Sequence, residues 1–226
     1  MNVPLRFKPF DERDKVRIYY SGCLPHWRQA GCTYFVTFRL ADSIPLPVLK
    51  QWEYERNVWL AARRIDPLTS DWKTAFRNLP PHERQLFERH FASTLFEFLA
   101  RGEGECVLRD PEIRSIVVDA LSYFHSQRLD TGDFAVMPNH VHALMTPYSG
   151  FELERVLHSI KSYTAKQINQ KLGRSGPLWM EESYDHIVRD GEELLRIQSY
   201  IRANPEKAGL GESEYSVHMA EYDLKY

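Results

Sequence analysis

The stretch Phe134–Met145, FAVMPNHVHALM, decides the fold expected for this chain, because it contains two histidines two positions apart among apolar residues. Pro138 and Asn139 favour a turn, so the stretch predicts two short strands joined as a hairpin, the second beginning at His140. Residues i and i+2 of a strand point to the same face of the sheet. The imidazoles of His140 and His142 should therefore stand side by side, as two ligands of a metal site or half of an acid–base pair.

The segments around this hairpin predict an α+β fold. Residues 33–40 and 183–188 have the β-branched and aromatic composition of strands, and residues 111–126, 151–172 and 190–203 have helical spacing of apolar residues. The block 46–105 predicts two or three peripheral helices, broken at Pro67 and at Pro80-Pro81. Without this block the order is strand, helix, strand, strand, helix, strand, helix. That is the ferredoxin-like (split βαβ) order, with an antiparallel sheet and an additional terminal helix.

Composition narrows the class of protein. A chain of 226 residues fits one domain with a sizeable insertion. It contains no run of about 18 apolar residues and begins with a charged stretch, so neither a membrane span nor a signal peptide is expected. Cys23, Cys32 and Cys106 form no C-x-x-C pair, which argues against a thiolate zinc site and against a disulfide framework. We expect a cytoplasmic protein with reduced thiols.

The last helix contains Tyr200 and Asn204, four residues apart and therefore on one side of the helix. An amide oxygen from Asn204 and two imidazoles would form an open shell for a divalent cation. Tyr200, one turn away, could then present its phenol to a phosphate. Purely structural roles are the alternative: Tyr200 could be a core residue, the histidines could pack in the sheet, and Asn204 before Pro205 could cap the helix.

Possible contacts with nucleic acid come from a local excess of positive charge. The net charge of −2 does not favour nucleic-acid binding, but residues 158–174 contain four cations and no acid. The candidate DNA-binding residues are Lys161, Lys166, Lys171 and Arg174, with His186 and Arg189 near the site in sequence order. Each of them could instead be a solvated surface charge.

At these residues the chain resembles a known family. MPNHVHALM (137–145) is similar to the His-hydrophobe-His (HUH) signature of single-tyrosine transposases. SYIRANPEKAGL (199–210) resembles the tyrosine helix of REP-associated tyrosine transposases, a single-tyrosine HUH family of insertion sequences. KSYTAKQIN (161–169), GPLW (176–179) and YDHIVRD (184–190) between them are also similar to that family. The similarity covers about residues 31–45 and 106–210.

This resemblance implies a single HUH transposase domain over residues 1–226, with a helical insertion at about 46–105 that compact members of the family do not have. It implies a metal-dependent endonuclease and strand transferase. Its substrate would be single-stranded DNA beside a hairpin such as a REP-like palindrome, cut through a 5′-phosphotyrosine intermediate. Tyr200 would be the nucleophile, and His140, His142 and Asn204 would bind Mg²⁺ or Mn²⁺. The protein would act in the cytoplasm, associated with the nucleoid and not with a membrane. It would be a monomer or a homodimer.

Two other functions stay open. A ferredoxin-like order also occurs in non-cleaving, RRM-like proteins that bind single-stranded nucleic acid. In such a regulator Tyr200 would pack or stack, and the two histidines would have no role. A metal-dependent hydrolase of small phosphoesters would use the histidines but would give no role to the tyrosine.

Overall fold

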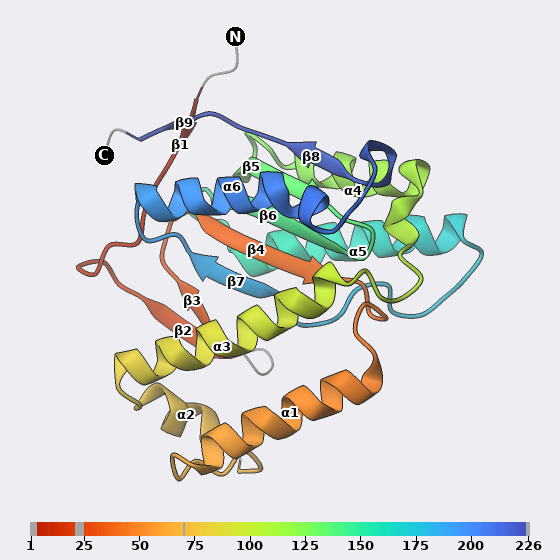
Figure 1. Ribbon diagram of the computed structural model, residues 1–226. Helices are drawn as coiled ribbons and strands as arrows, with labels where there is room; N and C mark the ends of the chain where they lie inside the picture. Colours follow the sequence, from red (N-terminus) through yellow and green to blue (C-terminus); the bar gives the residue numbers. More distant parts are fainter. Residues whose placement is uncertain (1–3, 21–24, 70, 225–226) are drawn as a thin grey trace.

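A five-stranded antiparallel sheet forms the centre of the computed structural model, which describes residues 4–20, 25–69 and 71–224 (Figure 1). Its strands lie in the order β7-β4-β6-β5-β8. Their bounds are Tyr34–Arg39 (β4), Leu129–Val136 (β5), His140–Pro147 (β6), Tyr184–Ile187 (β7) and Ser216–His218 (β8). Helix α4 (Pro111–Tyr123) connects β4 and the insertion to β5, and α5 (Leu153–Lys171) connects β6 to β7. The order β7-β4-β6-β5 is that of a split βαβ unit, so the predicted ferredoxin-like α+β fold is confirmed.

Strand register assigns the side chains to two covered faces. Thr37 pairs with His142 and Phe35 pairs with Leu144, so these side chains share one face. Helix α6 (Gly191–Lys207) covers this face, which we call the α6 face, and packs Leu194 against it. The opposite side, the α4/α5 face, packs the alternate residues of the same strands against α4 and α5. Because both faces are covered, every residue of β4 and β6 is buried.

Two predicted boundaries are wrong. The predicted terminal helix ends near residue 203, whereas α6 continues to Lys207 and includes Pro205. The helix continues because the backbone N–H of Ala208 donates to Asn204 and that of Leu210 donates to Pro205. The hairpin strands are also longer than predicted. They span eight residues each, because their ladder continues past a bulge between Thr131 and Phe134.

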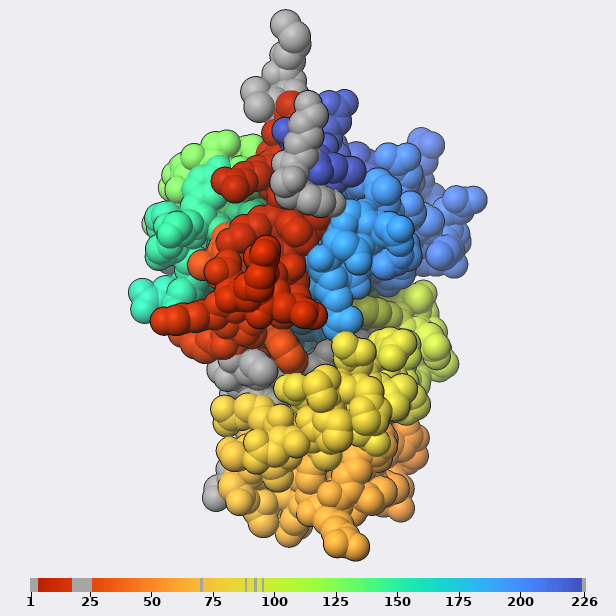
Figure 2. Space-filling view, turned by 90° about the vertical axis from the view of Figure 1, so that its left-hand side faces the viewer, coloured from red at the N-terminus to blue at the C-terminus, as the bar shows by residue number. Residues whose placement is uncertain are grey.

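Three helices fill the segment between β4 and α4, so the predicted helical insertion is confirmed. They are α1 (Leu46–Ala61), α2 (Trp72–Arg77) and α3 (Pro81–Ala100). A cluster of their own apolar side chains joins them: Leu60, Ile65, Phe76, Phe87 and Phe91. They form a block beside the sheet, with α3 between α1 and the strands (Figures 1 and 2). Proline in the first turn of α1 and of α3 suits helix starts, where its missing N–H has no partner to lose.

The chain ends form further strands that the sequence did not indicate. β1 (Leu5–Arg6) pairs with β9 (Tyr222–Asp223), and β2 (Arg17–Tyr20) pairs with β3 (Pro25–Arg28). Single 3₁₀ turns at Val107–Arg109 and Glu212–Glu214 precede α4 and β8. These pieces are too short to carry a periodic signal.

The remaining structural expectations concern cysteines and membrane spans. Cys32 and Cys106 are buried free thiols, and Cys23 lies outside the described residues. Among the described helices, none combines the length and the apolar composition that crossing a membrane requires.

A buried ion pair attaches β3 to the edge of the sheet. The Asp185 carboxylate on β7 accepts from the Arg28 guanidinium at 2.5 and 2.9 Å and lies 2.6 Å from Nδ1 of His26. Burial alone would raise the pKa of Asp185, but the hydrogen bonds from His26 and Arg28 outweigh it and lower that pKa. Arg28 also pairs with Glu154 of α5 at 3.1 Å. The N-terminal hairpin is therefore held by charge as well as by packing.

We expect Asp185→Asn to lower the free energy of unfolding by about 3 kcal/mol, since removing one partner leaves a buried charge uncompensated. Because the pKa of Asp185 is depressed in the folded state, its stabilisation is present above the unfolded pKa of about 3.9 and is lost as pH falls through the folded value. Urea unfolding at pH 7 and pH 3 measures this. Asp11→Asn, which removes an exposed partner of Arg13, is the control and should change little. Equal effects of the two substitutions would contradict the role of the buried pair.

Candidate active site

The two histidines of β6 face each other on the α6 face of the sheet. Nε2 of His140 lies 3.0 Å from Nε2 of His142, and both side chains are buried. Their spacing follows from the two-residue period of the strand. The sequence prediction that the two imidazoles lie side by side therefore agrees with the structure.

Neighbouring side chains hold both rings through their Nδ1 atoms. Nδ1 of His140 lies 2.7 Å from the Asn139 side-chain oxygen, which accepts its hydrogen. The Asn139 amide nitrogen donates to the carbonyls of Leu99 and Glu103 at the end of α3, and this fixes which way the amide points. Nδ1 of His142 lies 2.7 Å from Oγ1 of Thr37 on β4, which can accept its hydrogen too. In that arrangement both Nε2 atoms carry a lone pair, and that of His142 can accept the hydrogen of the Tyr200 hydroxyl.

Burial keeps these imidazoles neutral. It lowers the pKa of His140 to about 3. Burial, followed by the neighbouring His140, lowers the pKa of His142 well below its ordinary value. A neutral imidazole is the form that binds a metal ion or accepts a proton.

Helix α6 adds Tyr200 and Asn204 to the same place. Oη of Tyr200 lies 3.2 Å from Nε2 of His142. Burial raises the pKa of Tyr200 to about 12, and the neighbouring Asn204 amide acts in the opposite direction. The side-chain oxygen of Asn204 is buried and has no hydrogen-bond partner among the residues that the structure describes. The structure thus brings Tyr200 of α6 to His142 of β6, with His140 beside His142 and Asn204 beside Tyr200.

This donor set fits a metal site with open positions. Across residues 4–20, 25–69 and 71–224, no group of three or more His, Cys, Asp or Glu side chains could hold a metal ion. The candidate ligands here are instead two imidazole nitrogens, which lie 3.0 Å apart, and the amide oxygen of Asn204 on the helix that covers them. An unpartnered buried oxygen costs free energy, and a cation beside it would relieve that cost. Fewer protein ligands than a closed shell leave room for substrate oxygens.

Aromatic rings surround the four residues. Phe35 of β4 stacks on His142, with ring centroids 5.5 Å apart. Phe96 of α3 approaches His142 at 5.6 Å and Tyr200 at 6.3 Å between centroids. The insertion therefore forms one wall of the site. Sequence reasoning did not single out Phe96, because nothing in the pattern of α3 indicates which of its apolar residues face the sheet.

Thr37 and Asn139 are two further polar residues that sequence reasoning missed. Asn139 was recognised only as a turn residue, and Thr37 only as part of a strand. A usable signal did exist for Thr37. On β4 it stands between Phe35 and Arg39 in the period-2 pattern, as a polar residue on the face that carries the histidines.

Most of the predicted DNA-binding cations lie on the other side of the sheet. Helix α5 packs on the α4/α5 face, away from Tyr200. The ammonium group of Lys161 donates to the carbonyls of Met180 and Glu181, and burial lowers its pKa to about 8. Lys171 pairs with Glu112 and Arg174 with Glu105, while Lys166 is exposed. Because α5 lies on the face opposite α6, these cations do not line the Tyr200 site.

His186 and Arg189 lie closer to the α6 face. His186 pairs with Phe35 in the sheet register, and its Nε2 lies 3.1 Å from a carboxylate oxygen of Glu193. Arg189 is exposed, and its backbone N–H donates to the other oxygen of Glu193. Both residues thus stand at the β7 edge of the sheet, where α6 begins.

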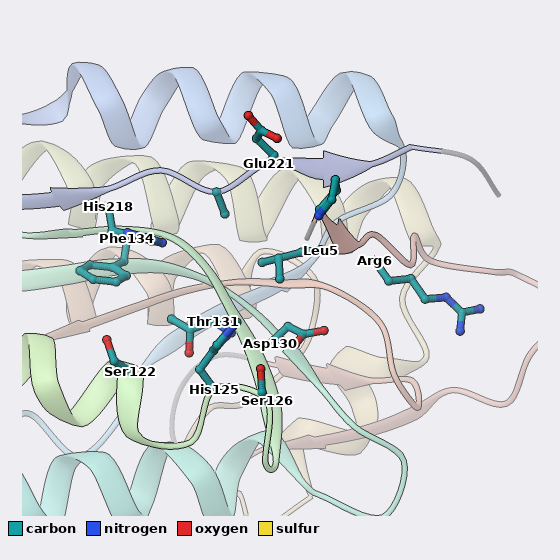
Figure 3. A pocket seen from close by; sticks show the side chains of 12 residues that line it. Leu5, Arg6, Ser122, His125, Ser126, Asp130, Thr131, Phe134, His218 and Glu221 are labelled. Carbon is teal, nitrogen blue, oxygen red and sulfur yellow. The ribbon is translucent and has the colours of Figure 1, made fainter. Parts of the chain in front are cut away.

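A separate pocket of about 630 Å³ lies at the opposite edge of the sheet, beside β5 and β8 (Figure 3). His125 lines it and accepts a hydrogen bond from the backbone N–H of Thr131. His218 also lines it and stacks on Phe134, with ring centroids 5.2 Å apart. Both rings have structural contacts there, and the pocket lining does not include Tyr200.

Residues 111–204 match the family model described as IS200-like transposase. This part of the chain is similar to the IS200-like transposases. It runs from the first residue of α4 to Asn204 and contains all four residues that meet on the α6 face. A solved structure described as a REP-associated tyrosine transposase bound to a REP hairpin is also similar. It has 13% sequence identity and a TM-score of 0.40, over 88% of this chain and 93% of that chain. The comparison with curated proteins found no match.

We expect acid to destabilise the protein through His140. Its pKa is lowered on folding, so its neutral form stabilises the fold fully above the unfolded pKa of about 6.5. This stabilisation is lost as pH falls from there towards 3. One such group contributes a slope of up to about 1.4 kcal/mol per pH unit. Urea unfolding between pH 7 and pH 4 should give a shallower slope for His140→Asn than for the wild type. The exposed His90→Asn is the control, and equal slopes for wild type and His140→Asn would contradict this expectation.

Proposed function

We propose that this protein is a metal-dependent single-stranded DNA endonuclease and strand transferase that uses Tyr200 as its nucleophile. The observation that carries the proposal is the contact of 3.2 Å between Oη of Tyr200 and Nε2 of His142, in the segment that matches the transposase family. A regulator that only binds nucleic acid would have no need for two converging buried imidazoles beside this phenol. A hydrolase of small phosphoesters would have no need for the phenol.

His140, His142 and Asn204 would hold the divalent ion, Mg²⁺ or Mn²⁺. When bound, it would supply positive charge that stabilises the charge developing on the scissile phosphate. The protein prepares the ligands in advance. Asn139 and Thr37 orient the rings, and burial keeps them neutral at physiological pH.

Tyr200 would form the covalent bond. Its oxygen attacks the phosphorus in line, the bond to the 3′ oxygen of the preceding nucleotide breaks, and the phenol proton ends on that leaving oxygen. A 5′-phosphotyrosine and a free 3′-hydroxyl result. Because the ester stores the bond, another 3′-hydroxyl can attack it and release Tyr200. The buried phenol with a pKa of about 12 is a weak nucleophile alone, so attack depends on a positive charge nearby.

The DNA partner would be a hairpin with an unpaired strand at the cut. An unpaired strand exposes its phosphate for in-line attack and its bases for stacking on aromatic side chains. His186 and Arg189 stand on the side of the sheet that Tyr200 faces. Lys161, Lys166, Lys171 and Arg174 could reach only another part of the DNA, such as the stem.

The whole chain would act as one transposase domain with α1–α3 as an insertion. The position of Phe96 against Tyr200 supports this, because the insertion and the matched segment build the same site. We propose that the protein acts as a monomer or homodimer in the cytoplasm, in association with the nucleoid.

We expect Tyr200→Phe to abolish strand cleavage and the covalent protein–DNA adduct, because the substitution keeps the ring and removes the attacking oxygen. Binding of the DNA hairpin should persist. The measurement uses a labelled hairpin with single-stranded extensions, incubated with Mg²⁺ or Mn²⁺ and separated on a denaturing gel. Tyr163→Phe changes an exposed tyrosine of α5 and is the matched control, which should cleave normally.

Cleavage by Tyr200→Phe at the wild-type rate would show that water or another residue is the nucleophile. Binding without cleavage by the wild-type protein, across hairpins and both metals, would favour the non-cleaving regulator.

We expect Thr37→Val to weaken Mn²⁺ binding about tenfold or more, because the hydroxyl that orients His142 is lost. Losing a group that hydrogen-bonds to a metal ligand has an effect of this size in other proteins. Isothermal titration calorimetry without DNA measures this independently of catalysis. Thr146→Val is the matched control. It removes another buried hydroxyl of the same sheet, one that contacts Thr33. Equal affinities in Thr37→Val and Thr146→Val would contradict the role of Thr37.

A further inference from the structure

A second pocket lies close to the Tyr200 site, between the insertion and the edge strand β7. Its volume is about 320 Å³. Phe10, Trp27 and Tyr184 give it aromatic walls, and Arg84 and Arg189 give it positive charge. We call it the α3/β7 pocket. The N-terminal segment, α3 and the β7–α6 segment meet on this face of the molecule (Figure 2).

Two hydrogen-bond donors of this pocket have no acceptor. Nε1 of Trp27 and Nε of Arg84 are both buried without a hydrogen-bond partner among the described residues. The side chains touch, since the guanidinium carbon of Arg84 lies 5.3 Å from the centroid of the Trp27 ring. Both groups can only donate, and a buried donor without an acceptor is unfavourable. A ligand with acceptor atoms at this wall of the pocket would satisfy them.

The charges around the pocket favour a ligand that carries phosphate. Arg84 and Arg189 line it, together with Pro81 in the first turn of α3. A helix N-terminus adds partial positive charge. Two carboxylates also line the pocket. Asp185 is neutralised by Arg28 and His26, and Glu12 is exposed to solvent. Aromatic walls, unpartnered donors and net positive charge together suit a nucleotide.

Aromatic contacts connect this pocket with the tyrosine. Tyr184 lines the pocket and contacts Phe96, with ring centroids 5.1 Å apart. Phe96 in turn lies 6.3 Å from Tyr200 between centroids. A strand that reaches Tyr200 could therefore continue along these rings into the pocket.

We propose that the α3/β7 pocket binds an unpaired nucleobase of the DNA strand that enters the Tyr200 site, which rests on the function proposed above. The base stacks on Tyr184, and acceptor atoms on its edge receive hydrogen bonds from Nε1 of Trp27 and from Arg84. Arg189 attracts the adjoining phosphate. Because Arg84 belongs to α3, the helical insertion contributes a base-selecting residue to the transposase-like site.

An abasic scan of the single-stranded extensions tests this assignment. Binding of a fluorescent hairpin is measured in EDTA, so that no cleavage occurs, with each base outside the stem removed in turn. One position should weaken wild-type binding about tenfold, the size of a lost stacking contact. Arg84→Gln should weaken binding of the intact strand about tenfold, and Trp27→Phe, which keeps a ring, about threefold. In Arg84→Gln, removing the base at this sensitive position should weaken binding little further.

Arg89→Gln is the matched control, since Arg89 lies on the same helix, is exposed and does not line the pocket. It should bind like the wild type. The assignment is overturned if no abasic position weakens binding. It is also overturned if the fold-losses in affinity from Arg84→Gln and from base removal multiply. A third contradicting outcome is that Arg84→Gln weakens binding of a hairpin without extensions to the same degree. Thermal unfolding shows whether each variant is folded. If Trp27→Phe does not fold, the binding result for Arg84→Gln alone decides. Because binding in EDTA needs no chemistry at Tyr200, failure here is distinct from absence of the covalent adduct.

Discussion

The pairing of β6 with β4 is the constraint on which the candidate site depends. It places His142 opposite Thr37 and turns both histidines towards α6. A shift of one residue would point the imidazoles into the α4/α5 face, among the apolar side chains of the core. The register is held because the alternate residues of the same strands are fully buried aliphatic and aromatic side chains. The packing of one face thus positions the chemistry of the other.

Burial makes the site reactive, and it is also unfavourable for the free energy of folding. Burial keeps the imidazoles neutral, and Asn139 and Thr37 hold the two rings through their Nδ1 atoms. The same burial raises the pKa of Tyr200 to about 12 and leaves the oxygen of Asn204 unpartnered. These features are unfavourable for the isolated protein, and a cation bearing a phosphate would relieve them. We interpret them as preparation for a charged substrate and not as a means of stabilising the fold.

The helical insertion is part of this arrangement and not only an addition at its edge. The carbonyls at the end of α3 fix the amide of Asn139, and Phe96 of the same helix packs on His142 and Tyr200. The beginning of α3 contributes Arg84 to the pocket beside β7. One helix therefore touches both the proposed nucleophile and the proposed base site. This gives a physical reason to treat the chain as one functional unit.

From the sequence alone, the order of the central elements was predictable, and four residues could be named as candidates for the site. The i, i+2 spacing of His140 and His142 and the i, i+4 spacing of Tyr200 and Asn204 are local geometry, which fixes faces without knowledge of the fold. The sequence could not place Phe96 or Arg84, because which side of α3 meets the sheet depends on how the insertion folds back. It also could not show that α5 carries its cations to the face opposite Tyr200. Only the tertiary structure decided these points, since they depend on contacts between residues distant in the chain, which local periodicity does not encode.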